Sequence, residues 1–201
     1  SPLRVVPNGV DVNYYAPNGF VPQGHTLVFN GSLTYAANLD AVEYFADEIF
    51  PLVKQRAPDV CFQVTGRNDG VKLADALRQP GITLTGYLDD IRPTVGCAWV
   101  CVAPIRTGGG TRLKILEAMA LGTPVVSTTK GAEGSNVTPG QDILLADNPT
   151  EFAERILDVF DDAALRARLS ANARRLVETQ YDWNAIGSEF CALVEELGHV
   201  A

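Results

Sequence analysis

The sequence predicts an α/β domain, with a doubly wound, mostly parallel sheet, helices on both faces and a helical carboxy-terminal segment. Two observations predict this fold class. Short apolar runs bounded by Gly, Pro or Asn alternate with segments whose apolar residues recur at helical spacing, as βαβ units require. From Asn148 onward the pattern is helical throughout. The 201 residues, 46% of them hydrophobic, suffice for one domain with its own core.

The chain opens on a segment without helical or strand periodicity. Residues 1–25 begin at Ser1 and are rich in Pro, Gly and Asn, which favour turns and loops. We therefore expect residues 1–25 to be a linker segment cut from a longer protein. Residues 26–201 are then expected to form a single Rossmann-like domain.

The first βα unit follows this linker. Residues 26–32 form a short apolar run that ends in Asn-Gly and Ser, which is typical of a buried strand followed by a tight turn. We expect a helix next, with Asn38 as its N-cap and an end at Ala57, before Pro58.

The same alternation continues along the chain. Strands are expected at residues 60–65, 82–85, 99–103, 124–127 and 143–145, and helices at 71–77, 90–95 and 111–121. Three more helices are expected at 149–160, 165–177 and 183–197. Sheets of this kind bind ligands at the carboxyl ends of their strands, and we expect the site there.

Composition and charge exclude several classes of function. A net charge of -8 argues against a grip on nucleic acid through Lys and Arg. The sequence has no Cys-x-x-Cys pair, and its four cysteines stand among apolar or small residues, namely Cys61, Cys97, Cys101 and Cys191. This setting predicts that the thiols are buried and reduced, which fits a cytoplasmic location of the protein. The sequence has no apolar run of about 20 residues that could span a bilayer.

The sequence also gives no reason to expect a metal or a cofactor. It has no cluster of Asp, Glu and His at ligand spacing. Its two histidines, His25 and His199, are expected at the surface.

The most informative segment contains three consecutive glycines. Gly108, Gly109 and Gly110 lie between the strand expected at 99–103 and a helix expected to begin at Thr111. Glycines let the backbone approach a ligand closely, and the first N–H groups of a helix are free to bind an anion. This arrangement predicts a diphosphate site, and the alternative is a loop that is only flexible.

Two cations stand in the first turn of that helix. A positive side chain is mildly unfavourable near a helix N-terminus, and a bound anion reverses this effect. Arg112 and Lys114 are therefore candidate diphosphate ligands. The alternative is that both are solvated, with Lys114 and Glu117 forming a surface pair three residues apart.

Glu117 follows within an otherwise apolar stretch of the same helix. A carboxylate there faces either solvent or a ligand rich in hydroxyl groups. Because it can accept hydrogen bonds from two vicinal hydroxyls, Glu117 is a candidate for holding a nucleotide ribose.

Six motifs follow one another in order along nearly the whole chain. The longest is the run Lys-Ile-Leu-Glu-Ala-Met-Ala-Leu-Gly-Thr-Pro-Val-Val at 114–126. The others are Val-Pro-Asn-Gly-Val-Asp at 6–11, Gly-Ser at 31–32, Val-Thr-Gly at 64–66, Gly-Tyr-Leu-Asp-Asp at 86–90 and Tyr-Asp-Trp at 181–183. Together these motifs resemble the carboxy-terminal domain of the retaining family 4 (group 1) glycosyltransferases of the GT-B fold.

The resemblance implies roles for individual positions. Glu117 matches the second Glu of the family's Glu-x7-Glu pattern, which holds the ribose of the donor nucleotide. The resemblance assigns no catalytic residue here. It places the donor diphosphate and sugar near Gly31, Ser32, Gly108, Gly109, Gly110, Thr111, Arg112 and Lys114, and the base near Arg67, Tyr87 and Leu88.

This sequence departs from the family pattern at two places. The first Glu of the pattern, which touches the donor sugar, falls on Gly109. The Arg and Lys that commonly grip the diphosphate after the first strand fall on Ser32 and about Asn38. We therefore expect Lys114 or Arg112 to supply the missing positive charge.

The leading hypothesis is the nucleotide-sugar-binding domain of a glycosyltransferase that transfers a hexose-type sugar with retention. The resemblance implies a missing amino-terminal acceptor domain as a partner, so we expect the fragment to be inactive alone. It leaves room for a peripheral membrane contact of the full-length enzyme. The alternative is a non-catalytic nucleotide-binding or interaction module. A nucleotide-sugar epimerase fits less well, because it should bring catalytic carboxylates and a histidine near the cleft.

The last expected helix carries an apolar stripe at helical spacing, formed by Trp183, Ile186, Phe190, Leu193 and Leu197. The stripe either packs on the domain's own sheet or faces the missing amino-terminal domain. If it is exposed, we expect the fragment to self-associate.

Overall fold

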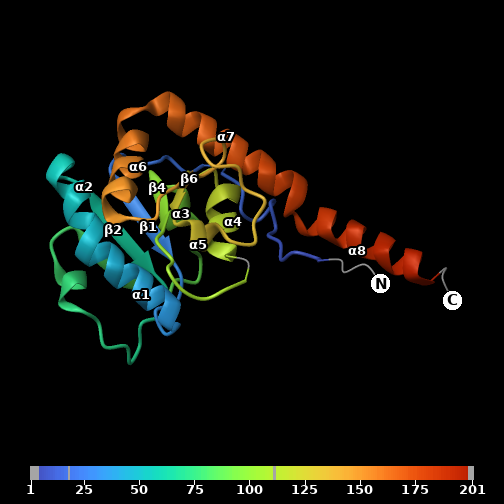
Figure 1. Cartoon of the computed structure of the whole chain (residues 1–201), viewed down its shortest axis with the longest axis horizontal. Helices are drawn as coiled ribbons and strands as arrows, with labels where there is room; N and C mark the ends of the chain where they lie inside the picture. The colour runs from blue at the N-terminus through green and yellow to red at the C-terminus, as the bar shows by residue number, and fades with distance from the viewer. Residues whose placement is uncertain (1–4, 18, 111, 199–201) are drawn as a thin grey trace.

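The structure, a computed structural model, describes residues 5–17, 19–110 and 112–198. In these ranges it contains one six-stranded sheet of order β3-β2-β1-β4-β5-β6, in which every paired strand is parallel (Figure 1). The predicted doubly wound sheet is therefore confirmed. Its strands are β1 (Thr26–Asn30), β2 (Cys61–Thr65), β3 (Ile82–Gly86), β4 (Val100–Ala103), β5 (Val125–Ser127) and β6 (Leu144–Leu145).

Helices connect the strands and then cover the sheet. The three helices expected after β6 are present. Asn148 is the N-cap of the first of them, and its side chain accepts a hydrogen bond from the Glu151 N–H. The α-helices are α1 (Ala36–Tyr44), α2 (Phe50–Arg56), α3 (Arg92–Gly96), α4 (Leu113–Ala120), α5 (Thr129–Ala132), α6 (Pro149–Asp161), α7 (Ala163–Gln180) and α8 (Trp183–Gly198).

Two apolar cores lie on the two faces of the sheet. On one face α1, α2 and α6 pack against β1 through Leu27 and Phe29 (Figure 1). On the other face α4 and α7 pack against Val28 of β1 and Cys101 of β4. This division follows from the alternation of side chains along each strand, which sends neighbouring residues to opposite faces.

The long helix expected after β1 is present but is not uniform. A π-helical turn, η1 (Phe45–Ile49), separates α1 from α2. Pro51 at the start of α2 has no backbone N–H, so it cannot donate the α-helical hydrogen bond to the residue four positions earlier. This missing bond accounts for the π-helical turn η1 just before it. Tyr35, and not Asn38, occupies the N-cap position of α1.

The prediction of a helix at residues 71–77 is wrong. Only a 3₁₀ turn, η2 (Asp75–Arg78), forms there, and Ala74 before it is extended. The Ala74 N–H donates to the Glu43 carboxylate on α1 at 3.1 Å, which replaces the bond that a helix would need. Apolar spacing alone does not show such a long-range contact.

The expectation of four buried thiols holds in part. All four cysteines are free, but only Cys101 is buried, Cys97 is half-buried, and Cys61 and Cys191 are exposed. Cys61 begins β2 and Cys191 lies on α8, where their apolar sequence neighbours do not predict their own exposure.

His25 lies near the surface as expected, and its ring is 2.7 Å from the Asp59 carboxylate. His199 lies outside the described residues. Within the described ranges, no helix is both long enough and apolar enough to cross a membrane.

The linker segment runs back along the domain and crosses the junction of α7 and α8. The Val10 N–H donates to the Tyr181 carbonyl at 2.8 Å, and the Trp183 N–H donates to the Val10 carbonyl at 3.3 Å. Further along, the Phe20 ring packs so closely on Gly96 that a Cβ there would lie 2.5 Å from it. These contacts fix the linker segment to the domain.

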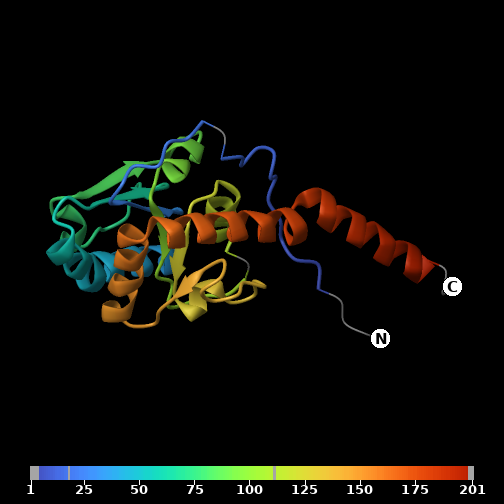
Figure 2. The same cartoon turned by 90° about the horizontal axis from the view of Figure 1, so that it is seen from above.

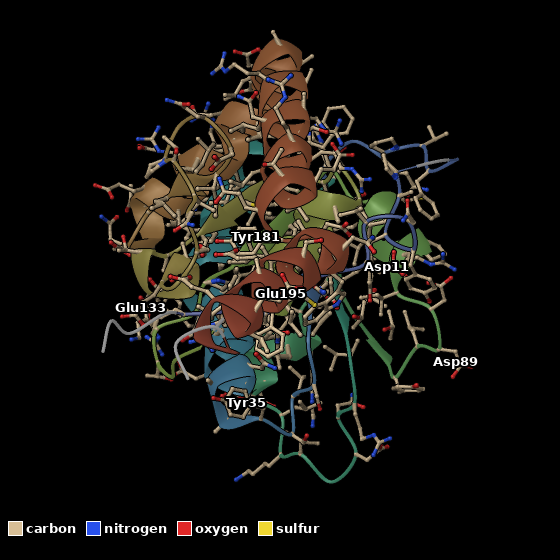
Figure 3. The ribbon with its side chains drawn as sticks, turned by 90° about the vertical axis from the view of Figure 1, so that its right-hand side faces the viewer. Asp11, Tyr35, Asp89, Glu133, Tyr181 and Glu195 are labelled. Atoms are coloured by element: carbon tan, nitrogen blue, oxygen red, sulfur yellow. The ribbon has the colours of Figure 1, made fainter. Side chains whose placement is uncertain are left out.

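Helix α8 extends away from the rest of the domain (Figure 2). Figure 3 looks at the molecule from the side to which α8 projects, and Glu195 lies on this helix. In the predicted stripe Ile186 is buried and Leu193 is half-buried, whereas Trp183 and Phe190 are about half exposed, at 49% and 50%. The Leu197 side chain lies outside the described residues. Most of the described stripe therefore does not pack on the domain's own sheet.

Candidate nucleotide-sugar site

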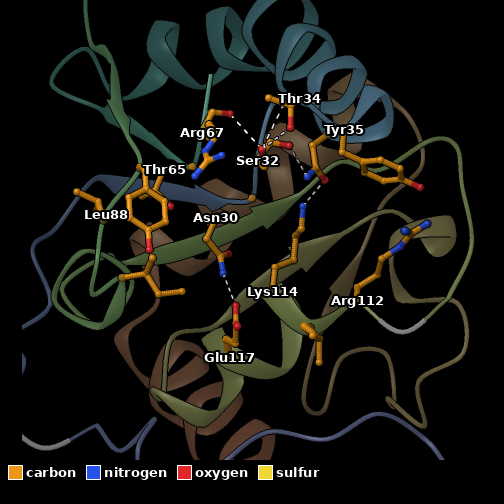
Figure 4. A pocket seen from close by; sticks show the side chains of 16 residues that line it. Asn30, Ser32, Thr34, Tyr35, Thr65, Arg67, Leu88, Arg112, Lys114 and Glu117 are labelled. Atoms are coloured by element: carbon orange, nitrogen blue, oxygen red, sulfur yellow. Dashed lines mark hydrogen bonds between the residues drawn. The ribbon is translucent and has the colours of Figure 1, made fainter. Parts of the chain in front are cut away.

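A pocket of about 650 Å³ opens at the carboxyl ends of the strands (Figure 4). Its walls come from the segments that follow β1, β2 and β3 and from the start of α4. It lies beside the point where strand order reverses between β1 and β4, which is where doubly wound sheets bind ligands. Its walls include eight of the predicted site residues, namely Gly31, Ser32, Arg67, Tyr87, Leu88, Arg112, Lys114 and Glu117.

Lys114 is a largely buried cation in this pocket. Its Nζ donates to Asn38 Oδ1 at 2.6 Å and lies 3.9 Å from the centre of the Phe29 ring. Burial, with a smaller contribution from the nearby positive charge of Arg112, lowers the pKa of Lys114 to about 7. An anion in the pocket would stabilise the charged form, so the site is suited to a phosphate group.

Glu117 lies one helical turn further along α4. Its Oε2 accepts a hydrogen bond from Asn30 Nδ2 at 2.8 Å (Figure 4). Its Oε1 accepts a hydrogen bond from the Tyr15 hydroxyl at 3.2 Å. Burial raises the pKa of Glu117 above its usual value, and these two hydrogen bonds and Lys114 oppose the rise.

The interpretation of Lys114 and Glu117 as a solvated surface pair is wrong. Both side chains are half-buried or more and line the pocket. Among the described residues no ion pair joins them, because Lys114 is turned to Asn38 and Glu117 to Asn30.

Two glycines allow the strand ends to approach one another. A Cβ on Gly31 would lie 2.7 Å from Lys114 Nζ, and a Cβ on Gly66 would lie 2.4 Å from the Gly31 carbonyl oxygen. Gly66 also has a φ of 124°, which other residues rarely adopt. The motifs Gly-Ser and Val-Thr-Gly therefore keep the floor of the pocket open to Lys114.

The glycine-rich loop lies at the rim and does not form the pocket wall. Gly108, Gly109 and Gly110 are exposed, and Cβ atoms on the last two would meet nothing within 4 Å. Arg112 is the N-cap of α4, and one guanidinium nitrogen donates to the Thr107 carbonyl at 3.3 Å. Thr111 lies outside the described residues.

The three residues predicted to flank the base line the opposite side of the pocket. The Arg67 guanidinium lies 5.7 Å from the centre of the exposed Tyr87 ring, and Leu88 continues the wall. The Arg67 carbonyl accepts hydrogen bonds from the Leu33 N–H and the Ser32 hydroxyl, which fixes the backbone here.

Sequence reasoning missed three polar residues that hold the site together. Tyr15 and Asn30 bond to Glu117, and Asn38 bonds to Lys114 and, through Nδ2, to the Ser32 carbonyl at 2.8 Å. Asn30 ends β1 within the Asn-Gly pair, so its place at a strand end was a usable signal. Nothing in the local sequence connects Tyr15 with a residue so far along the chain.

Comparison with known proteins places the domain in a family. Residues 24–162 match the family model "Glycosyl transferases group 1". Among curated proteins, the chain is 25% identical to a GDP-mannose-dependent monoacylated alpha-(1-6)-phosphatidylinositol monomannoside mannosyltransferase of Corynebacterium glutamicum, over 94% of this chain and 55% of the relative. It is 28% identical to a phosphatidyl-myo-inositol mannosyltransferase of Mycobacterium leprae, over 94% and 52%. The chain spans about half the length of these relatives.

Solved structures show the same fold. The carboxy-terminal domain of the group 1 glycosyltransferase LpcC from Francisella tularensis superposes with a TM-score of 0.68 at 20% identity, over 87% of this chain and all of that domain. Sucrose-phosphate synthase from Thermosynechococcus elongatus gives a TM-score of 0.77 at 21% identity, over 98% of this chain and 53% of that protein. This chain belongs to the group 1 glycosyltransferases and has the Rossmann-like fold of the carboxy-terminal domain of GT-B enzymes.

Proposed function

We propose that this domain binds the nucleoside-diphosphate sugar donor of a glycosyltransferase that transfers a hexose-type sugar with retention. One observation carries the proposal. Glu117 and Lys114, oppositely charged and one helical turn apart, both line the 650 Å³ pocket at the strand ends. A carboxylate suits the ribose hydroxyls and an ammonium suits the diphosphate.

The diphosphate lies in this proposal between Lys114 and the glycine-rich loop. Backbone N–H groups of Gly108, Gly109 and Gly110 would approach its oxygens, with Arg112 and Ser32 on either side. The open space around Gly109 and Gly110 leaves room for the phosphates and the sugar. Fixed donors and cations at this place stabilise the departing diphosphate in the transition state.

The base lies in this proposal against Arg67, Tyr87 and Leu88. The named ligands of relatives differ: the relative from Corynebacterium is named as GDP-mannose-dependent, and the structure of Anabaena HepE, similar at a TM-score of 0.74 and 20% identity, holds UDP and glucose. Both UDP and GDP are therefore the probes to use.

This chain spans about half the length of its named relatives, which supports a further domain in the complete enzyme. We propose that an amino-terminal domain binds the acceptor and closes the cleft over the pocket, so that the fragment binds donor without transferring it. Two of the relatives are named for phosphatidylinositol-based acceptors, which supports a peripheral contact of the full-length enzyme with the cytoplasmic face of a membrane.

Gly109, in place of the family's first Glu, keeps a second candidate function open, a module that binds nucleotides without catalysis. The two functions differ in the full-length protein. A glycosyltransferase releases UDP or GDP from its donor sugar when acceptor is present, whereas a binding module releases none.

Thermal unfolding of this chain with UDP, GDP and their hexose conjugates tests the proposal. Saturating nucleotide should raise the midpoint by several degrees, since a ligand at about 100 times its Kd adds about 2.7 kcal/mol. Glu117→Gln and Lys114→Met should abolish most of the rise. Matched charge changes at two exposed residues away from the pocket, Lys72→Met and Glu154→Gln, should leave it unchanged. An unchanged rise in both site variants would overturn the assignment.

A further inference from the structure

The Glu117 carboxylate is held from two sides, by Asn30 at Oε2 and by Tyr15 at Oε1. We propose that Tyr15 of the linker segment is a positioning residue, whose hydroxyl fixes the orientation in which Glu117 meets the two ribose hydroxyls. This inference rests on the proposed function. It adds a role for the linker segment, whose described residues contribute no side chain to the wall of the pocket.

The contact through Asn30 is rigid. Asn30 is buried at the end of β1, and its Oδ1 accepts a hydrogen bond from the buried Cys101 thiol, with Sγ 3.8 Å away. This leaves Nδ2 to donate to Glu117. One carboxylate oxygen is therefore fixed by the sheet itself. Among the described residues, Tyr15 is the hydrogen-bond partner of the other oxygen.

The backbone of Tyr15 is fastened to the helix that carries Glu117. The Arg174 guanidinium on α7 donates to the Tyr15 carbonyl at 2.7 Å, to the Val12 carbonyl at 2.9 Å and to the Ala120 carbonyl at 2.5 Å. Ala120 is the last residue of α4. Arg174 thus holds the linker segment against the end of α4, and the hydroxyl of Tyr15 reaches Glu117 from a fixed position.

The neighbouring Tyr14 connects the same segment to the base side of the pocket. The Arg92 guanidinium lies 3.9 Å from the centre of the Tyr14 ring and donates to the Tyr14 carbonyl at 3.1 Å. The Arg92 guanidinium also donates twice to the Asp90 carboxylate, at 2.8 Å each. Asp90 follows Tyr87 and Leu88 in the β3–α3 connection. The linker segment is therefore tied to both the ribose side and the base side.

This arrangement has a consequence for specificity. Each carboxylate oxygen has two lone pairs, and the protein uses one on each oxygen of Glu117. The remaining pairs can accept the 2′- and 3′-hydroxyls together only while the carboxylate keeps its orientation. Without the Tyr15 hydroxyl the carboxylate can rotate. The affinity for a ribonucleotide should then fall more than the affinity for a 2′-deoxyribonucleotide.

The test is calorimetric titration of this chain with UDP and 2′-deoxy-UDP, and with GDP and 2′-deoxy-GDP. Tyr15→Phe should weaken the ribonucleotide about tenfold, as expected for a lost hydrogen bond to a charged group, and the deoxynucleotide less than about threefold. In a Glu117→Gln background the same change should have no further effect. Tyr44→Phe, on α1 and outside the wall of the pocket, is the control and should leave both affinities unchanged. Equal losses for both sugars, or additive losses in the double variant, would overturn the proposal.

A second measurement needs no ligand and separates this inference from the proposed function. The groups that face Glu117 are Tyr15, Asn30, Cys101 and Lys114. Carbon-13 NMR of the Glu117 carboxyl should show a higher pKa in Tyr15→Phe than in the unaltered chain, because a hydrogen bond to the ionised form is lost. If no nucleotide binds, the proposed function fails and the inference about ribose fails with it. If nucleotides bind but this pKa does not move, only the role of Tyr15 fails.

Discussion

Lys114 and Glu117 lie in the same pocket, where burial disfavours the charged form of each side chain. Burial lowers the pKa of the lysine and raises the pKa of the carboxylate. Each side chain has lost part of its hydration. A bound diphosphate would stabilise the charged amine of Lys114, and ribose hydroxyls would stabilise the carboxylate of Glu117. Such perturbed pairs in a cleft are typical of functional sites.

The pKa of Lys114 predicts a pH dependence of binding. The groups around it are Cys101, Arg112 and Glu117, and with a pKa of about 7 the amine loses its charge as the pH rises above neutrality. A diphosphate prefers the charged amine, so its affinity should fall above pH 7, by up to about tenfold per pH unit. The phosphate's own pKa of about 6 lies below this range. Calorimetric titration from pH 6.5 to 9 checks this.

Lys114→Arg is the control for that experiment, since the guanidinium stays charged throughout. It should bind with little pH dependence over the same range. An affinity of the unaltered chain that stays constant to pH 9 would contradict a buried, titrating lysine.

The same lowered pKa predicts an effect on stability. The unfolded chain binds the Lys114 proton up to a higher pH than the folded chain does, so stability should rise as the pH increases above about 7. Lys114→Met should remove this pH dependence and raise the free energy of unfolding near neutrality by about 1–3 kcal/mol, at the expense of nucleotide binding. Urea unfolding checks this, with Lys72→Met as the exposed control. A less stable Lys114→Met variant would show that the lysine supports the fold.

At the scale of elements, the site depends on three strand ends lying close together. The chain is packed so closely at Gly31, after β1, and at Gly66, after β2, that neither position has room for a side chain. The Lys114 side chain of α4 reaches Gly31. The loops carry the site, whereas the parallel strands beneath them set where those loops start.

Gly66→Ala should disrupt this packing. The new Cβ would lie 2.4 Å from the backbone oxygen of Gly31, at a φ of 124°. We expect a loss of about 2–4 kcal/mol from the free energy of unfolding, measured by urea denaturation. Gly24→Ala is the matched control, because a Cβ there would meet nothing within 4 Å, and it should change stability by less than about 0.5 kcal/mol. Equal effects of the two changes would refute this account of the pocket floor.

Elements that depend on local pattern could be predicted from the sequence, and those that depend on distant contacts could not. The strands and the helix around Glu117 follow from apolar periodicity and glycine punctuation. The helix expected at 71–77 fails because Glu43 captures the Ala74 N–H. Likewise Asn38 serves Lys114 and Ser32 instead of capping α1. Tyr15 was missed because its partner lies 102 residues further along the chain.

At the scale of the molecule, α8 is the element least integrated with the domain. It extends from the body in Figures 1 and 2, with Trp183, Phe190 and Val194 about half exposed. The linker segment crosses the base of this helix at Val10 and Tyr181. We propose that these apolar side chains of α8 pack against the amino-terminal domain proposed for the full-length enzyme.

An isolated chain with this helix should self-associate. Exposed apolar side chains along one helix favour contact between copies. Sedimentation velocity should show species heavier than 21.6 kDa that increase with concentration. Replacing both Phe190 and Val194 by Ser should shift the distribution to the monomer without lowering the melting temperature. A chain that stays monomeric at millimolar concentration would contradict the exposure of α8.

The decisive experiment is a crystal structure of this chain with UDP or GDP bound. The nucleotide should lie across the ends of β1, β2 and β3, with ribose hydroxyls about 3 Å from the Glu117 carboxylate and the diphosphate within reach of Lys114 Nζ. The base should lie against Tyr87 and Leu88. A nucleotide bound elsewhere, or one whose phosphates point to the Tyr87 side, would overturn the proposed donor site.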